Sequence, residues 1–139
     1  MIGLADTSAW TTKHRSPDVA KDFDRQAQSG QVATCDVVRF ELLFTAVDFD
    51  DFVAMREELA ALPDVPVGPR IWRRALEVFE LFARRGPLHH RQVRFPDLLV
   101  AAAAEQAGLP VLHYDRDFEL IAAVTGQLVR AIAPLGSLG

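Results

Sequence analysis

The sequence predicts one α/β domain over residues 1–139, in which a short, mostly parallel sheet is covered by helices on both faces as a three-layer α/β/α sandwich. Two observations predict this class. Short apolar runs without alternation of polar residues recur along the chain, which is typical of strands buried on both faces. Longer segments with helical spacing of apolar residues separate these runs. A chain of 139 residues, half of them apolar, is long enough to bury a core of its own.

Strands are expected where a short apolar run is flanked by turn residues. These runs are residues 2–5, 32–35, 111–113 and 129–133, with a small strand at 65–67 inside a loop bracketed by prolines. We therefore expect a small sheet whose strands are far apart in the sequence.

The helices of the first half are predicted by their caps. Ser16 is an N-cap followed by proline and an acid, and Gly30 ends that helix. Asp36 and Asp48 can cap the next two helices. In the helix that follows Asp36, the residues expected to face the core are Val37, Phe40 and Phe44.

The second half contains two strong helical segments and a short one. Residues 70–85 place one apolar stripe along a helix, formed by Ile71, Ala75, Phe79 and Phe82. Pro96 begins the next helix with Asp97 in its first turn, and Gly108 ends it. A short helix is expected at residues 118–124.

Composition excludes two classes of protein. The longest apolar run, residues 98–104, is far shorter than the roughly 20 residues of a membrane-spanning helix. The single cysteine, Cys35, cannot form a disulfide within the chain and is expected to be a buried small hydrophobic residue. Because the N-terminus also lacks the basic segment of a signal peptide, a cytoplasmic location is expected.

Charge is unevenly distributed, although the formal net charge is only −4. Seven arginines lie between Arg70 and Arg94, against the two acids Glu77 and Glu80. Arginine grips phosphate groups through paired hydrogen bonds, but a solvated face of an amphipathic helix has the same composition. Both interpretations stay open on charge alone.

Acidic residues stand at the predicted strand ends and helix starts. In a parallel sheet, ligands bind beyond the carboxyl ends of the strands, so four acids are expected to converge there: Asp6, Glu41, Asp97 and Asp115. Grouped carboxylates repel one another unless some hold protons or a cation lies between them, and an all-oxygen set suits Mg²⁺ or Mn²⁺. Singly, each acid is also compatible with a helix cap, a turn or a surface ion pair.

Four segments in order resemble the motifs of PIN domains, and their spacing and the chain length are similar to the VapC-type toxins of bacterial toxin–antitoxin modules. The segments are Asp6-Thr7-Ser8-Ala9-Trp10, Val38-Arg39-Phe40-Glu41-Leu42-Leu43, residues 96–104 and residues 111–118. The resemblance covers essentially the whole chain. It implies an α/β/α sandwich, a Mg²⁺- or Mn²⁺-dependent ribonuclease acting on tRNA or rRNA, a homodimer, and inhibition by a cognate VapB-like antitoxin.

The resemblance also implies roles for individual residues. The acidic quartet that it implies as catalytic and metal-binding is Asp6, Glu41, Asp97 and Asp115. Asp117 matches an auxiliary, metal-binding acid, and Ser8 matches a hydroxyl position near the first acid. His113 departs from the family, which often has serine or threonine just before the fourth acid.

Partner contacts are expected on two surfaces. Arg91 and Arg94 lie nearest Asp97 in the sequence and are candidates to hold the RNA backbone, with a purely solubilising role as the alternative. The aromatic residues of segments 44–52 and 70–82 could receive an apolar and basic tail of the antitoxin.

Two alternatives to a ribonuclease stay open. One is a PIN-like module that binds RNA or protein without cleaving it. The other is phosphoryl chemistry in a different α/β fold, a response-regulator receiver or a haloacid-dehalogenase-like phosphatase; both need a lysine late in the chain, whereas the only lysines are Lys13 and Lys21. The pair His89-His90 lacks zinc-ligand spacing and is expected in a loop.

Overall fold

The sheet has four parallel strands in the order β2-β1-β3-β4, in a computed structural model that describes residues 2–139. The strands are β1 (Gly3–Ala5), β2 (Val32–Ala33), β3 (Val111–His113) and β4 (Val129–Ala131). The helices are α1 (Thr7–Thr12), α2 (Pro17–Gln28), α3 (Asp36–Leu43), α4 (Phe49–Ala60), α5 (Pro69–Arg84), α6 (Phe95–Ala107) and α7 (Arg116–Thr125), with 3₁₀ turns η1 (Lys13–Arg15) and η2 (His89–Gln92).

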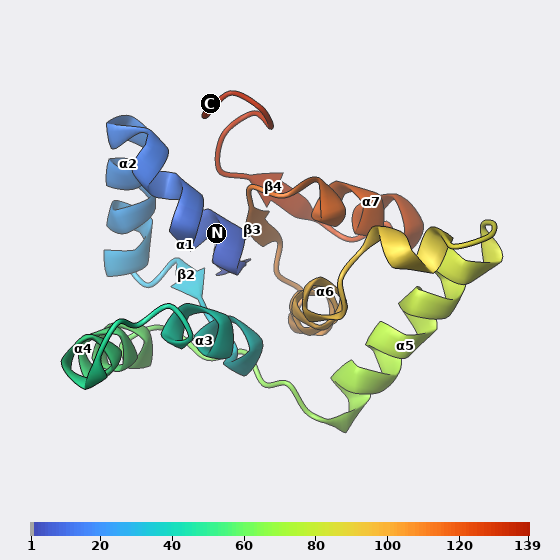
Figure 1. Cartoon of the computed structure of the whole chain (residues 1–139), viewed down its shortest axis with the longest axis horizontal. Helices are drawn as coiled ribbons and strands as arrows, with labels where there is room; N and C mark the ends of the chain where they lie inside the picture. The colour runs from blue at the N-terminus through green and yellow to red at the C-terminus, as the bar shows by residue number, and fades with distance from the viewer. Residues whose placement is uncertain (1) are drawn as a thin grey trace.

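Helices cover both faces of this sheet, so the predicted three-layer α/β fold is confirmed. Figure 1 shows α1 and α2 on one side of the strands, and α3, α6 and α7 on the other. Helix α5 lies outside α6 and α7, and α4 packs beside α3.

The central strands bring the two ends of the sequence together. Leu4 of β1 pairs with Val111 of β3, and Ala5 pairs with Leu112. Gly3 permits this close packing, because a Cβ at position 3 would lie 2.8 Å from the Cγ of Leu112. The residues that follow β1 and β3 therefore emerge side by side at the carboxyl edge of the sheet.

Helix α6 lies at the centre of the molecule and is seen end-on in Figure 1. Residues 97–104 are all buried, which accounts for the longest apolar run of the sequence. The four consecutive alanines, residues 101–104, let α5, α7 and the sheet approach this helix closely. Gly108 ends the helix in the left-handed conformation with φ of 69°.

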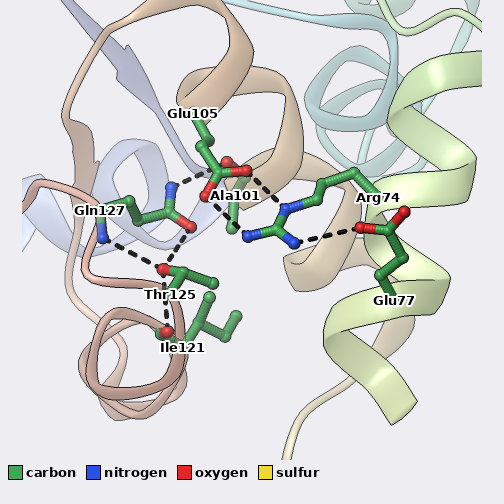
Figure 2. A network of polar contacts seen from close by, with 7 residues as sticks. All are labelled: Arg74, Glu77, Ala101, Glu105, Ile121, Thr125 and Gln127. Carbon is green, nitrogen blue, oxygen red and sulfur yellow. Dashed lines mark hydrogen bonds and ion pairs between the residues drawn. The ribbon is translucent and has the colours of Figure 1, made fainter. Parts of the chain in front are cut away.

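A polar network fastens α5 and the segment after α7 to α6 (Figure 2). Arg74 on α5 donates from Nε and Nη2 to the two carboxylate oxygens of Glu105 on α6, at 2.7 and 3.1 Å, and from Nη1 to Glu77. Gln127 donates from Nε2 to the carbonyl of Ala101 at 2.8 Å. Since the Arg74–Glu105 pair is bidentate and half-buried, it fixes the position of α5 along α6 better than an exposed ion pair would.

Two predictions about the core are wrong. Phe79 was expected on the apolar stripe of α5, but it is 38% exposed and Val78 is buried instead. Phe40 and Phe44 were expected to face inward, but they are 79% and 89% exposed. Helix α3 turns Val38 and Leu42 to the core instead. Its N-cap is Cys35 rather than Asp36, and the four-residue spacing that we assigned to Phe40 and Phe44 is shared by Val38 and Leu42 two positions earlier.

The structure also differs from the sequence prediction in three short elements. Helix α1 was not predicted, because it has only six residues and follows the strand without a linker. The strand expected at 65–67 is reduced to a single bridge between Thr34 and Asp64, and the last strand ends at Ala131. Residues 2–139 contain no helix with the length and apolarity that crossing a membrane requires.

Candidate active site

The ends of three segments place the acids at one edge of the sheet. Asp6 follows β1 and caps α1, since its Oδ2 accepts the N–H of Ser8 at 2.9 Å. Asp97 lies in the first turn of α6. Asp115 follows β3 and caps α7, since its Oδ1 accepts the N–H of Asp117 at 2.9 Å. The capping roles foreseen for Asp6 and Asp115 thus coexist with their place in the acidic group.

Three carboxylates form the tightest group. Asp97, Asp115 and Asp117 each offer an oxygen atom, and these atoms lie within 4.8 Å of one another. Asp97 is buried, whereas Asp115 and Asp117 are half-buried. The group is therefore reached from solvent on the side of the loop that joins β3 to α7.

Asp97 is the most perturbed acid of the group. Burial raises its pKa to about 8, helped by the negative charges of Asp6 and Asp115 and by a hydrogen bond with Asp117, while Arg94 acts in the opposite direction. At neutral pH and without a cation, Asp97 therefore holds a proton.

Asp6 extends the acidic group toward α3. Burial raises its pKa, hydrogen bonds from Ser8 oppose the rise, and the charge of Glu41 adds to it. The Oδ1 of Asp6 is buried and has no hydrogen-bond partner among residues 2–139. The same holds for the Oδ2 of Asp97.

Glu41 lies at the margin of the group, with both carboxylate oxygens occupied. Its Oε1 accepts from the Thr7 hydroxyl at 2.8 Å, and its Oε2 accepts from Nη2 of Arg94 at 2.9 Å. Thr7 is a contact that the sequence analysis missed; only its place beside Asp6 in the first motif could have suggested it. Glu41 is thus the only member of the expected quartet that an arginine neutralises directly within the described chain.

The donor set fits a divalent cation. Buried carboxylate oxygens without partners are costly. One of the two here, Oδ2, belongs to Asp97 of the three-acid group, and the other, Oδ1, belongs to Asp6, whose charge acts on Asp97. The ligand atoms are all oxygens, which hard divalent cations prefer. A divalent cation would relieve both the repulsion between the acids and the unmet hydrogen-bonding capacity of Asp6 and Asp97.

Ser8 and His113 both contact the backbone of the loop between β3 and α7, and Ser8 also donates hydrogen bonds to Asp6. The Ser8 hydroxyl accepts the N–H of Tyr114 at 3.0 Å, and Nδ1 of the buried His113 accepts the N–H of Asp115 at 3.1 Å. The expected auxiliary residue Ser8 therefore lies beside the acids, and so does His113, which departs from the family pattern.

The remaining candidates lie as follows. Arg91 is exposed on η2 and forms no ion pair with any described residue. His89 and His90 lie on the same 3₁₀ turn instead of the expected loop, and no metal-ligand group within residues 2–139 includes them. Cys35 is buried as expected, and burial raises the pKa of its thiol, which keeps it protonated.

Comparison with known proteins identifies the family. The PIN domain family model matches residues 4–124. The chain is 41% identical to Ribonuclease VapC18 of Mycobacterium tuberculosis over 138 residues, which cover 99% of this chain and all of that protein. This membership excludes the receiver and phosphatase alternatives.

Solved structures of VapBC toxin–antitoxin proteins are also similar to this chain. VapBC-5 of Mycobacterium tuberculosis, a member of the VapBC family of toxin–antitoxin systems, is 28% identical with a TM-score of 0.61, covering 94% of this chain and 96% of that one. DNA-bound VapBC of Salmonella typhimurium is 17% identical with a TM-score of 0.73, covering 96% of this chain and all of that one, and shares the fold. The chain belongs to the PIN-domain family and, within it, to the VapC ribonucleases.

Proposed function

We propose that this single domain of 139 residues is a metal-dependent endoribonuclease toxin of the VapC type, with Asp6, Glu41, Asp97 and Asp115 as its catalytic and metal-binding acids and Asp117 as a further ligand. The observation that carries the proposal is the group of carboxylates around Asp97. Its buried, unpartnered oxygens need a cation, and the chain belongs to a family of nucleases.

Mg²⁺ or Mn²⁺ is the proposed cofactor. A bound divalent cation of this kind lowers the pKa of a water molecule and neutralises developing charge on a phosphodiester. The chain contributes the oxygen ligands from three separate segments. Asp97 holds a proton without the cation because burial and the neighbouring acids raise its pKa, and the positive charge of a bound cation would favour its ionised form.

RNA of the tRNA or rRNA class is the proposed substrate. Arg91, exposed and unpaired within the described chain, and Arg94, beside Glu41, can hold phosphate groups next to the acids. These cations offset the acidic group at the point where a polyanion must approach it.

A cognate VapB-like antitoxin is the proposed partner, since the similar solved structures are VapBC complexes. Phe40, Phe44 and Phe49 form an exposed aromatic surface on α3 and α4, beside the acidic first turn of α4. An apolar and basic segment suits such a surface. Phe49 stacks on Phe52, with the ring centres 6.4 Å apart, so Phe52 supports this surface. Alanine at Phe49 or Phe52 should weaken the complex, and unchanged affinity in both variants would exclude this surface.

A homodimer and a cytoplasmic location complete the proposal. Both follow from the toxin–antitoxin character of the relatives. Sedimentation of the purified chain tests the dimer independently of activity.

Cleavage of total cellular RNA tests the activity, with Mg²⁺, Mn²⁺ or excess EDTA, beside the Asp97→Asn variant. Discrete fragments are expected only with a divalent cation and only from the wild type. Asp50→Asn, which removes a carboxylate from α4 outside the acidic group, is the matched control and should cleave normally.

Two results would overturn the nuclease. Cleavage in excess EDTA, or equal cleavage by Asp97→Asn, would show that the acids are not the site. Binding of both cation and RNA without any cleavage would identify the catalytically silent PIN-like module instead.

A further inference from the structure

The loop from His113 to Asp117 carries two of the grouped acids but leaves the sheet before it reaches them. The carbonyl of His113 accepts the last sheet-type hydrogen bond, from the N–H of Ile132 at 2.9 Å. Beyond that point, the backbone N–H groups of Tyr114 and Asp115 pair with side chains. The position of Asp115 therefore depends on the side chains that accept these hydrogen bonds.

Ser8 connects the first acid to this loop. Its backbone N–H donates to Oδ2 of Asp6 at 2.9 Å, while its hydroxyl oxygen accepts the N–H of Tyr114 at 3.0 Å. One residue thus orients Asp6 through its backbone and holds the loop of Asp115 through its side chain, although the two segments are more than 100 residues apart.

His113 holds the next N–H group along the loop. Its Nδ1 accepts from the N–H of Asp115 at 3.1 Å, and its Nε2 lies 3.2 Å from Oε1 of Glu119 on α7. Because Nδ1 is an acceptor, the neutral ring carries its proton on Nε2, facing Glu119. The ring is fully buried and packs against Phe118, with the ring centres 5.4 Å apart, so its orientation is fixed.

We propose that Ser8 and His113 are positioning residues, which together clamp the backbone of residues 114 and 115 so that Asp115 and Asp117 meet Asp97. Asp115 then orients Asp117, because its Oδ1 accepts the N–H of Asp117 at 2.9 Å. Glu119 takes part by facing the Nε2 side of the ring and thereby favouring the tautomer in which Nδ1 is free to accept. The inference rests on the proposed function only in taking these acids as cation ligands.

Ser8→Ala and Ser8→Thr test the first half of the clamp. Loss of a residue that orients metal ligands typically weakens metal binding by about 10–100-fold. We expect Ser8→Ala to weaken Mn²⁺ binding by about tenfold in calorimetry, and to speed hydrogen exchange of the Tyr114 amide in the metal-free protein. Ser8→Thr keeps the hydroxyl and should restore both. Ser29→Ala, at the exposed end of α2, is the matched control and should change neither.

His113→Leu and His113→Asn test the second half. Leucine fills the buried space without an acceptor, so Mn²⁺ binding should weaken about tenfold and the Asp115 amide should exchange faster. Asparagine can accept an N–H two residues later through its own side chain, so it should recover most of the affinity. Circular dichroism and thermal unfolding of each variant separate a loss of the clamp from a loss of the fold.

Amide exchange of Tyr114 and Asp115 in the metal-free protein is a readout that does not depend on the metal. Wild-type Mn²⁺ affinity and amide exchange in both Ser8→Ala and His113→Leu would overturn the clamp. These measurements do not require RNA cleavage. If the wild type does not cleave RNA but the variants lose Mn²⁺ affinity, only the proposed function is contradicted. If the wild type cleaves RNA but the variants keep wild-type Mn²⁺ affinity, only the clamp is contradicted.

Discussion

Arg94 donates from Nη2 to Oε2 of Glu41 at 2.9 Å, across 53 residues of sequence. The pair joins the N-cap residue of α6 to α3, and its guanidinium also lowers the pKa of the neighbouring Asp97 carboxyl. Arg94, for which an RNA contact or a solubilising role was expected, is therefore also the counter-charge of the acidic group. The positive charge of Arg94 should therefore weaken the binding of a divalent cation and strengthen the binding of RNA.

Arg94→Ala should bind Mn²⁺ more tightly but cleave RNA more slowly. Removing a positive charge beside several carboxylates strengthens cation binding by about tenfold, while losing a phosphate contact lowers kcat/KM by a similar factor. Calorimetry and a cleavage assay at fixed ionic strength measure the two. Arg91→Ala, at an exposed position with no ion pair in the described chain, should leave Mn²⁺ affinity unchanged. Weaker Mn²⁺ binding by Arg94→Ala would show that the arginine supports the site instead of competing with the cation.

The metal-free protein should become less stable as pH rises from about 4 to about 8. The folded pKa of Asp97, about 8, lies above its value of 3.8 in an unfolded chain, so the folded state holds a proton that the unfolded state has already lost. Each pH unit in this window costs up to about 1.4 kcal/mol, and the slope disappears above pH 8. Urea unfolding in EDTA measures it, and Asp97→Asn should show a clearly shallower slope over the same range. Parallel profiles for the two proteins would contradict the assignment.

Divalent cation should stabilise the folded state and reverse that pH dependence. A ligand that binds only the folded chain at 100 times its Kd adds about 2.7 kcal/mol, which corresponds to roughly 8 °C in Tm for a domain of this size. Thermal unfolding with and without Mn²⁺ tests this. Asp97→Asn and Asp117→Asn should lose most of the increase, and Asp50→Asn should keep it. An equal increase in all four proteins would place the cation elsewhere.

Gly3→Ala should destabilise the fold. The added methyl carbon would lie 2.8 and 2.9 Å from the Cγ and Cδ2 of Leu112, a buried side chain that would have to shift. Overpacking of this kind costs about 1–3 kcal/mol. Gly68→Ala is the control, because a Cβ there meets no atom within 4 Å. Equal free energies of unfolding for the two variants would mean that β1 and β3 are less tightly packed than described.

The fold class could be predicted because its signals are local. The continuous apolar runs around Leu4 and Val111 predicted buried strands, and the caps at Ser16 and Gly108 predicted helix ends. The orientation of α3 could not be predicted, because its apolar residues occupy more than one face of the helix. Phe40 and Phe44 have the same four-residue spacing as Val38 and Leu42, so the spacing did not show which pair faces the core. Only contact with α6 and α4 decides between them.

The candidate site was predictable as a set of acids but not as a set of contacts. Sheet topology alone brings the residues after β1 and β3 to one edge, so Asp6 and Asp115 could be paired in advance. The pairing of Glu41 with Thr7 and Arg94 depends on side-chain reach across α1, α3 and α6, which has no signature in the order of residues.

The central position of β1 and β3 in the sheet also governs when the protein can become active during its synthesis. β1 leaves the ribosome first, yet its neighbour β3 follows more than 100 residues later. Pairing between segments so far apart is slow and must wait until residues 111–117 have emerged. The growing chain thus carries Asp6 for most of its synthesis without Asp97 and the loop that complete the acidic group, and a cell translating this toxin meets an assembled centre only when the chain is nearly finished.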